Sequence, residues 1–331
     1  MKAPAFWAAG LDPASREAAP VTRALLTPFT WLYLAGLRRK LAKAVPAKAG
    51  IPVICIGNLT TGGTGKTPVA EALRERINAL GVRAATLSRG HGGSEAGPLR
   101  VDPARHTYRE VGDEPLLLAA TGEAWIGRSR PAAAAAMQAA GVGAVLMDDG
   151  HQNPSLAKDF TFIVIDAGAP FGNGHVLPKG PLREPIREGL ARADAVILMG
   201  DGDVPAEVIA SGKPVLRAQL TVQGAAPGGP LVAFAGIGRP QKFFDSLREA
   251  GGDVRDDIPF ADHHPYTAAD MTFLQGLAAR DGARLVTTAK DHVRLPPAAR
   301  AVVVVLPVKA VFETPEALDA LLAPIFKRAA P

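Results

Sequence analysis

The chain has 331 residues, of which 47% are hydrophobic, and it carries a formal net charge of +5 and a single cysteine. This length and apolar content predict a globular protein of one large domain or, more readily, two, and they exclude a low-complexity chain. Because Cys55 is the single cysteine, an internal disulfide is excluded, which fits a reducing cytosol. Cys55 itself is expected to be a small residue of the core.

The first segment, residues 1–50, is basic and aromatic. Residues 18–50 contain no acidic side chain and six basic ones, which are Arg23, Arg38, Arg39, Lys40, Lys43 and Lys48. The rest of the chain therefore sums to −1, the total of +5 less this +6. A nucleic-acid-binding protein usually spreads its basic face over the folded domain, so this distribution argues against a nucleic acid partner.

The same segment predicts an amphipathic helix. Thr27 and Pro28 are typical of an N-cap and a first helical residue, and the helix is expected to run to about Lys43. Its apolar face would hold Leu26, Phe29, Tyr33 and Leu37. Two interpretations stand, a helix in a membrane interface and a helix docked on the protein's own core. The apolar run of fourteen residues, 24–37, is too short to span a bilayer, and the segment lacks the pattern of a signal peptide.

A glycine-rich loop at 57–68, with the sequence GNLTTGGTGKTP, lies between an apolar run and a helical stretch. Strand, glycine loop, Lys-Thr and helix in this order are typical of a P-loop, although Thr60 stands where the common pattern has its first glycine. In a P-loop the backbone N–H groups and the lysine bind phosphates, and the hydroxyl after the lysine binds Mg²⁺. The expected nucleotide-binding residues are Gly62, Gly63, Thr64, Gly65, Lys66 and Thr67.

Continuous apolar runs recur between helical stretches, which predicts a mostly parallel sheet with helices on both faces, an α/β fold of the P-loop NTPase kind. The expected strands lie at 53–56, 83–87, 144–147, 162–165, 195–199, 231–235, 284–287 and 302–306. A Gly/Pro-rich connector at 222–230 divides the chain. We expect a P-loop core at 51–222 and a smaller α/β domain at 223–331 that contributes to the active-site cleft.

Acidic residues stand at the ends of two expected elements. Asp148 and Asp149 end an apolar strand, the arrangement that places a carboxylate on Mg²⁺ beside a P-loop, although a strand followed by Asp-Asp-Gly is also a common turn. Asp113 precedes a helical stretch and is either an N-cap or a general base for a hydroxyl acceptor.

A second polar cluster, Asp262-His263-His264, predicts metal binding or an oriented base. Neighbouring Asp and His also occur in a class of metal-dependent phosphoesterases, but the further motifs of that class are missing. The loop 88–92 follows a strand, and 177–185 is a proline/glycine loop with charged residues. Each either lines the ligand crevice or lies on the solvated surface.

Together these motifs resemble the tetraacyldisaccharide 4'-kinase family, the lipid A kinases, in ordered blocks over nearly the whole chain. The blocks are the basic aromatic N-terminus, GNLTTGGTGKTP at 57–68, SRGHG at 88–92, VGDEP at 111–115, DDGHQ at 148–152, LPKGPLREP at 177–185, FADHHPY at 260–266 and TTAKD at 287–291. A P-loop alone is shared by many families, whereas the ordered set is far more specific.

The resemblance implies ATP- and Mg²⁺-dependent transfer of the γ-phosphate to the 4'-hydroxyl of tetraacyldisaccharide 1-phosphate, which gives lipid IVA in lipid A biosynthesis. It implies a monotopic protein on the cytoplasmic face of a Gram-negative inner membrane, with the lipid A disaccharide precursor as substrate and the N-terminal helix at the membrane surface. No obligate protein partner is expected.

Residue roles follow from the same resemblance. Asp113 is expected to be the base and His263, rather than His264, to support its protonation state. Arg89 and Arg183 are expected to contact the substrate, and the expected metal ligands are Thr67, Asp148, Asp149 and Glu184. The chain departs from the family pattern at three positions that affect fine substrate contacts, which are His91, His151 and Asn153.

Three other functions compete with this interpretation. A P-loop GTPase or metallochaperone would carry an N-K-x-D motif, which 288–291 does not match. A nucleotide-binding module without catalysis would not need Asp113 and the Asp-His-His cluster. A soluble small-molecule kinase would not need the basic aromatic N-terminus.

Overall fold

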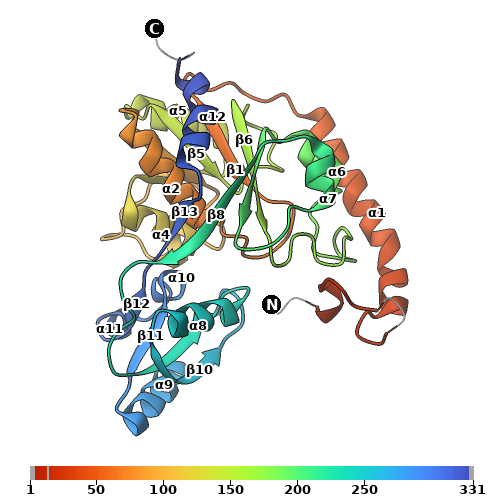
Figure 1. Ribbon diagram of the computed structural model, residues 1–331. Helices are drawn as coiled ribbons and strands as arrows, with labels where there is room; N and C mark the ends of the chain where they lie inside the picture. Colours follow the sequence, from red (N-terminus) through yellow and green to blue (C-terminus); the bar gives the residue numbers. More distant parts are fainter. Residues whose placement is uncertain (1–3, 13–14, 328–331) are drawn as a thin grey trace.

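The structure, a computed structural model, describes residues 4–12 and 15–327 and contains two α/β units (Figure 1). The larger unit is built on a nine-stranded sheet in the order β13-β8-β7-β6-β1-β5-β2-β4-β3. All neighbouring pairs are parallel except β3–β4 and β8–β13. The strands are β1 Val53–Gly57, β2 Ala84–Ser88, β3 Leu99–Arg100, β4 Ala124–Ile126, β5 Ala144–Asp148, β6 Phe160–Asp166, β7 Ala195–Met199, β8 Val215–Val222 and β13 Val308–Phe312.

The central strands are apolar throughout because helices cover both faces of the sheet. Along β1, Ile54 and Ile56 face one core and Val53 and Cys55 face the other, as the two-residue period of a strand requires. The first core is closed by α2 Lys66–Ala79, α4 Asp113–Thr121 and α12 Pro315–Lys327, and the second by α5 Arg130–Ala139. A third cluster takes in α6 Ile186–Ala191 and α7 Ala206–Ser211.

The smaller unit has a four-stranded parallel sheet in the order β10-β9-β11-β12. Its strands are β9 Pro230–Ala235, β10 Asp253–Pro259, β11 Arg284–Thr288 and β12 Val304–Leu306. The α9 helix, Ala268–Asp281, packs on one face of this sheet and α8, Pro240–Glu249, on the other. The short helices α10 Ala289–His292 and α11 Pro297–Arg300 follow β11.

The chain crosses between the two units twice, out through β8 and back through β13, which pair with each other in antiparallel register. The sequence prediction assigned all of residues 223–331 to the C-terminal domain. The structure instead places β13 and α12 in the larger unit, because Phe312, Leu318 and Leu322 are buried in the core that α2 also closes. The C-terminal unit is therefore an excursion from the large sheet rather than the end of the chain.

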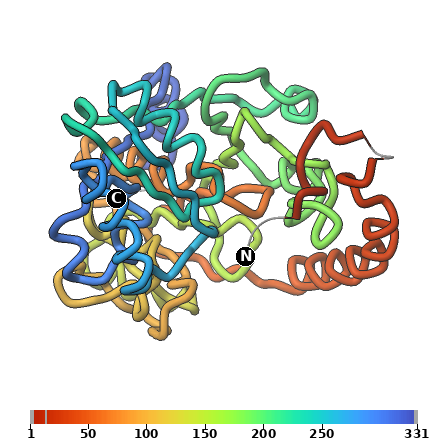
Figure 2. The backbone as a smooth tube through the Cα atoms, turned by 90° about the horizontal axis from the view of Figure 1, so that it is seen from below, coloured from red at the N-terminus to blue at the C-terminus, as the bar shows by residue number. Residues whose placement is uncertain are grey.

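The N-terminal helix α1 spans Pro20–Lys43, so its start at residue 27 was predicted too late. Pro20 occupies the first turn, and Pro28 lies inside the helix. Thr30 and Leu34 face the protein, and Leu34 packs on the cluster that α6 and α7 share. Figures 1 and 2 show α1 along the rim of the larger unit, on the side away from the C-terminal unit.

The predicted apolar face of α1 does not match its burial pattern. Leu26 and Leu37 are half-buried, whereas Phe29 and Tyr33 are exposed. The helix carries apolar side chains on both sides, and the outward ones are Val21, Leu25, Phe29, Trp31 and Leu32. Among residues 4–12 and 15–327, no helix has both the length and the apolar content needed to cross a bilayer.

Before α1, the short helix η1 Ala5–Trp7 is hydrogen-bonded to the loop that follows β6. Asn173 donates its backbone N–H to the Trp7 carbonyl at 2.9 Å, and the Trp7 indole donates to the Pro178 carbonyl at 3.2 Å. The remaining helix of the larger unit, α3 Tyr108–Val111, lies directly before α4.

Candidate active site

The glycine-rich loop joins β1 to α2, so its backbone approaches a helix N-terminus. Gly65 is the N-cap and has φ +86°, a conformation that favours glycine, and Lys66 is the first helical residue. The Asn58 side chain supports the loop from within by donating to the Thr60 carbonyl at 2.7 Å and to Thr64 Oγ1 at 3.3 Å. The sequence thus builds a fixed anion-binding turn.

The loop 177–185 packs along the glycine-rich loop. Thr61 donates its N–H to the Pro181 carbonyl at 2.8 Å, and Arg183 donates its N–H to the Leu59 carbonyl at 2.7 Å. This pairing brings the Arg183 side chain to Asp149, where Nη1 lies 2.8 and 2.9 Å from the two carboxylate oxygens. The predicted substrate arginine therefore lies beside a predicted metal ligand.

Asp148 and Asp149 follow each other at the end of β5, which pairs directly with β1. Asp148 is buried, and burial together with the nearby Glu114 carboxylate raises its pKa to about 7. Its Oδ1 atom is buried without a hydrogen-bond partner. A buried carboxylate oxygen without a partner at this position suits the binding of a metal cation.

Asp149 has the opposite electrostatic environment. Burial by itself would raise its pKa, but Lys66 and Arg183 outweigh burial and lower the pKa to about 2. Its Oδ1 lies 3.5 Å from Lys66 Nζ. The two carboxylates suit Mg²⁺, which takes one or two protein carboxylates and completes its shell with phosphates and water. Thr67, the predicted hydroxyl ligand, follows Lys66 in the first turn of α2.

Glu184 lies in a different cluster from Asp148 and Asp149. Its buried carboxylate accepts hydrogen bonds from Gln152 Nε2 at 2.9 Å and Arg192 Nη2 at 2.5 Å. In the described part of the chain, no three Asp, Glu, His or Cys side chains gather closely enough to hold a metal ion. The structure therefore does not bring Glu184 in as a third carboxylate ligand, and its hydrogen bonds indicate a bracing role.

His151, one of the expected departures from the family pattern, belongs to the same cluster. Its Nε2 lies 3.1 Å from the Gly189 carbonyl and 3.6 Å from Glu184 Oε1. Burial, with the Arg192 and Lys158 cations, lowers the pKa of His151 to about 3. The ring is therefore neutral at ordinary pH and donates to the carbonyl.

Asp113, the first residue of α4, is buried beneath the C-terminal unit. Its Oδ2 lies 2.8 Å from His263 Nδ1 and 3.3 Å from Arg294 Nη1, and its Oδ1 accepts the Glu114 N–H at 3.0 Å. Burial favours the neutral acid, but His263, Lys290 and Arg294 outweigh it and lower the pKa of Asp113 to about 2. The carboxylate is therefore ionised and can accept a proton.

The two neighbouring histidines have different environments. His263 has φ +57° and places its ring between Asp113 and Lys290, whose Nζ lies 3.2 Å from Nε2. His264 turns away, with Nε2 3.1 Å from Asp270 Oδ2 and its ring against Phe260. The structure thus brings His263, and not His264, to Asp113.

Contacts between the two units surround these groups. A side chain at Gly238 would lie 3.3 Å from the backbone nitrogen of Gly63, so the C-terminal unit closely approaches the glycine-rich loop. Lys290 Nζ lies 3.6 Å from Glu114, and Lys242 Nζ lies 3.0 Å from Asp166 Oδ1. The glycine-rich loop and Asp113 therefore border the same junction between the units.

Arg89 follows β2 and is exposed at the carboxyl edge of the large sheet, the edge at which β1 and β5 also end. Burial, and then the charge of Arg89, lower the pKa of Arg130, while Asp149 and Asp148 raise it. The guanidinium of Arg89 therefore adds to the positive potential near the carboxylates that end β5. Its position on a loop at this edge agrees with the general location of ligands in open α/β sheets.

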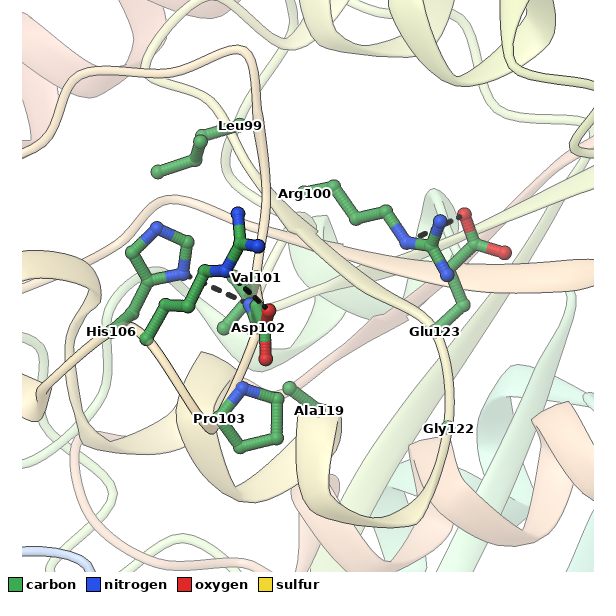
Figure 3. A pocket seen from close by; sticks show the side chains of 10 residues that line it. Leu99, Arg100, Val101, Asp102, Pro103, His106, Ala119, Gly122 and Glu123 are labelled. Carbon is green, nitrogen blue, oxygen red and sulfur yellow. Dashed lines mark hydrogen bonds and ion pairs between the residues drawn. The ribbon is translucent and has the colours of Figure 1, made fainter.

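A hollow of about 810 Å³ lies elsewhere, at the edge strand β3 and its neighbour β4 (Figure 3). Its arginines are paired with acidic neighbours, Arg100 with Glu123 at 3.6 Å and Arg105 with Asp102 at 3.4 Å. It contains none of the predicted site residues, so the geometry favours the junction between the units as the active site.

Sequence reasoning missed Lys290 and Arg294 as neighbours of Asp113. The segment 287–291 was one of the blocks of the family resemblance, but it lies more than 170 residues after Asp113, and nothing in the sequence indicated that the two are in contact. Only the docking of the C-terminal unit on α4 brings the two segments together.

Comparison with known proteins gives one consistent family. The family model described as "LpxK: Tetraacyldisaccharide-1-P 4'-kinase" matches residues 22–327. A tetraacyldisaccharide 4'-kinase of Hyphomonas neptunium is 72% identical over 99% of both chains, and one of Maricaulis maris is 51% identical over 97% of this chain and 96% of the relative. The crystal structure of LpxK from Aquifex aeolicus in complex with ATP has a TM-score of 0.72 and 25% identity, covering 92% of this chain and 99% of that one.

Proposed function

The chain belongs to the tetraacyldisaccharide-1-P 4'-kinase family, and on this premise we propose that it transfers the γ-phosphoryl group of ATP to the 4'-hydroxyl of a tetraacyldisaccharide 1-phosphate. One observation carries the proposal. The Asp113 carboxylate and the glycine-rich loop border one junction, where the C-terminal unit binds Asp113 through His263 and approaches the loop closely at Gly238. Phosphoryl transfer to an alcohol needs this combination of a phosphate cradle and a proton acceptor.

The nucleotide phosphates would lie on the N–H groups of Gly62, Gly63, Thr64 and Gly65, with Lys66 at the β/γ-phosphates. A preformed set of such donors offsets negative charge that develops in the transition state without reorganising at the moment of reaction. Bound Mg²⁺ supplies further charge neutralisation on the phosphates. Thr67, Asp148 and Asp149 would hold it, in agreement with the unpartnered Oδ1 of Asp148.

Asp113 would orient the 4'-hydroxyl and take its proton, while His263 fixes one carboxylate oxygen. Arg183 lies beside Asp149 and can contact the phosphates or the 1-phosphate of the lipid, and Arg89 stands on the same edge of the sheet. Glu184 would hold Gln152 and Arg192 behind the glycine-rich loop.

The acyl chains of the substrate require a lipid surface, and α1 supports a peripheral site on the cytoplasmic face of the bacterial inner membrane. Its outward side exposes 60–72% of Val21, Leu25, Phe29, Trp31 and Leu32. Arg39, Lys40 and Lys43 follow at its C-terminal end. An exposed apolar side with basic residues nearby is the combination that binds anionic lipid interfaces.

The direct test is product analysis. The full-length protein, ATP, Mg²⁺ and tetraacyldisaccharide 1-phosphate in detergent micelles should give a lipid heavier by one phosphoryl group, with a second phosphomonoester at the 4' position by ³¹P NMR. ATP hydrolysis without any phosphorylated lipid would contradict the proposal, and phosphate at another hydroxyl would contradict its assigned position.

A further inference from the structure

Arg294 contacts Asp113 from the opposite unit, although it lies outside every motif recognised in the sequence. It stands in the turn between α10 and α11, is 2% exposed, and directs Nη1 to Asp113 Oδ2 at 3.3 Å. A buried guanidinium is costly unless acceptors surround it, so its placement against Asp113 requires explanation.

The other arm of Arg294 is anchored within the C-terminal unit. Its Nη2 donates to the Gly236 carbonyl at 2.8 Å and to Asp291 Oδ1. Asp291 is itself held by the Tyr266 hydroxyl at 2.8 Å, the Gly236 N–H at 2.9 Å and the Thr288 hydroxyl at 2.6 Å. The guanidinium is therefore held in place by groups of its own unit. Because it is planar, this leaves Nη1 directed toward the larger unit and Asp113.

This arrangement gives Asp113 two partners from the same unit. His263 and Arg294 both bind Oδ2, and the Glu114 N–H binds Oδ1, which keeps a lone pair for an incoming hydroxyl. Lys290, the other nearby cation, contacts Glu114 and His263. An arginine guanidinium carries its charge in a planar fork of donors, a geometry that suits the binding of a carboxylate such as Asp113.

We propose that Arg294 is a positioning residue that fixes the Asp113 carboxylate when the C-terminal unit docks, so that alignment of the base depends on contact between the two units. The proposal rests on the proposed function, because it requires Asp113 to receive the acceptor proton. Arg294 acts through Asp113 and does not need to touch the substrate.

The test is a double-mutant cycle on γ-phosphoryl transfer by the full-length protein, with ³²P-labelled ATP and tetraacyldisaccharide 1-phosphate. Arg294→Met should lower kcat by up to about 100-fold, because a small displacement of a catalytic group has effects of this size. The KM values for ATP and lipid should change by less than about threefold. In an Asp113→Asn background the same substitution should lower kcat by less than about threefold, because the carboxylate on which Arg294 acts is gone.

Arg74 provides a matched control. It is also a buried arginine, and it binds the opposite end of α4 through the Leu118 carbonyl at 2.9 Å and Thr121. Arg74→Met should lower kcat by the same factor in the wild-type background and in the Asp113→Asn background, since it acts only on packing. Arg294→Lys keeps the positive charge, so its kcat should lie between those of Arg294→Met and the wild type. If Arg294→Met does not fold, Arg294→Lys replaces it in the double-mutant cycle.

Equal losses from the Arg294 substitution in both backgrounds would overturn the positioning role and leave the kinase assignment intact. Failure of the wild-type protein to label the lipid would overturn both. A loss confined to the wild-type background, with Arg74→Met additive, supports the proposal.

Discussion

Lys66 Nζ lies 3.5 Å from Asp149 Oδ1, and the same carboxylate receives Arg183 Nη1 at 2.8 Å. These two ion pairs connect the glycine-rich loop, the end of β5 and the loop 177–185. The two cations keep Asp149 ionised despite its burial. When phosphates and a divalent cation bind at this site, they would compete with these ion pairs, because Lys66, Asp149 and Arg183 already bind one another.

Lys66 is expected to contribute mainly in the transition state. Lys66→Met should reduce kcat for phosphoryl transfer by about 100- to 1,000-fold, the range found when one preorganised donor to developing charge is removed. Steady-state kinetics with the lipid acceptor measure the effect. Lys309→Met, which removes a lysine paired with Glu75, is the control and should retain activity. A Lys66 variant with nearly wild-type kcat would contradict the nucleotide site.

Asp148 is expected to be needed for the metal. Chelation of divalent cations should abolish transfer, and Asp148→Asn should raise the Mg²⁺ concentration required for half-maximal activity by about tenfold or more, because a neutral amide is a weaker ligand for a hard cation. A Mg²⁺ titration at fixed ATP measures this. The surface substitution Asp201→Asn is the control. An unchanged Mg²⁺ requirement in Asp148→Asn would place the metal elsewhere.

The exposed side of α1 is expected to bind membranes. A Leu25→Ser, Trp31→Ser variant should lose most of its binding to vesicles containing anionic phospholipid, because burial of each such side chain contributes roughly 1.5–3 kcal/mol. Flotation with vesicles measures the bound fraction. Phe273 on α9 is also exposed, at 53%, so Phe273→Ser is a matched control that should still bind. Equal loss in both variants would contradict a role specific to α1.

His151 should make stability depend on pH. Its pKa is about 3 in the folded protein and 6.5 ordinarily, so between these values the unfolded chain binds more protons. Stability from His151 is therefore lost as the pH falls below 6.5, by about 2 kcal/mol between pH 7 and pH 5. Urea unfolding at the two pH values measures the change in the free energy of unfolding.

Asp148 acts in the opposite direction over the same range, since its raised pKa of about 7 makes the folded protein bind more protons between 3.8 and 7. The comparison must therefore be made with His151→Gln, which can still donate to the Gly189 carbonyl but does not titrate in this range. Wild type should lose more stability than this variant on acidification. Identical pH dependence would show that His151 is not buried as a neutral ring.

The α/β class could be predicted from the sequence because buried parallel strands leave continuous apolar runs. The family was indicated separately, by the ordered motif blocks that the sequence shares with it. Each expected strand is present, from β1 to β12. The sequence prediction missed β3, β4, β8, β10 and β13. The first two are only two and three residues long, and the other three contain polar or charged residues that break the apolar pattern, as in Asp253–Pro259. Such strands depend on their neighbours in the sheet rather than on local composition.

The sequence could indicate candidate site residues where they are close together along the chain, as in the glycine-rich loop and the Asp148-Asp149 pair. Contacts that form only when the C-terminal unit docks on the larger unit could not be predicted from the sequence. Arg294 meets Asp113 across 181 residues, and the choice between His263 and His264 depends on the direction of one turn. The family resemblance favoured His263, while local pattern alone left both open.

The most direct test of the account is the rate of γ-phosphoryl transfer in three variants, Asp113→Asn, His263→Gln and His264→Gln. General-base catalysis contributes about 100- to 10,000-fold to a reaction rate, so Asp113→Asn should lower the transfer rate by a factor in this range. His263→Gln should also lower the transfer rate strongly. His264→Gln should keep activity near that of the wild type. Nearly wild-type transfer by Asp113→Asn, or a greater loss in His264→Gln than in His263→Gln, would contradict the assignment of the Asp113–His263 pair as the centre of the reaction.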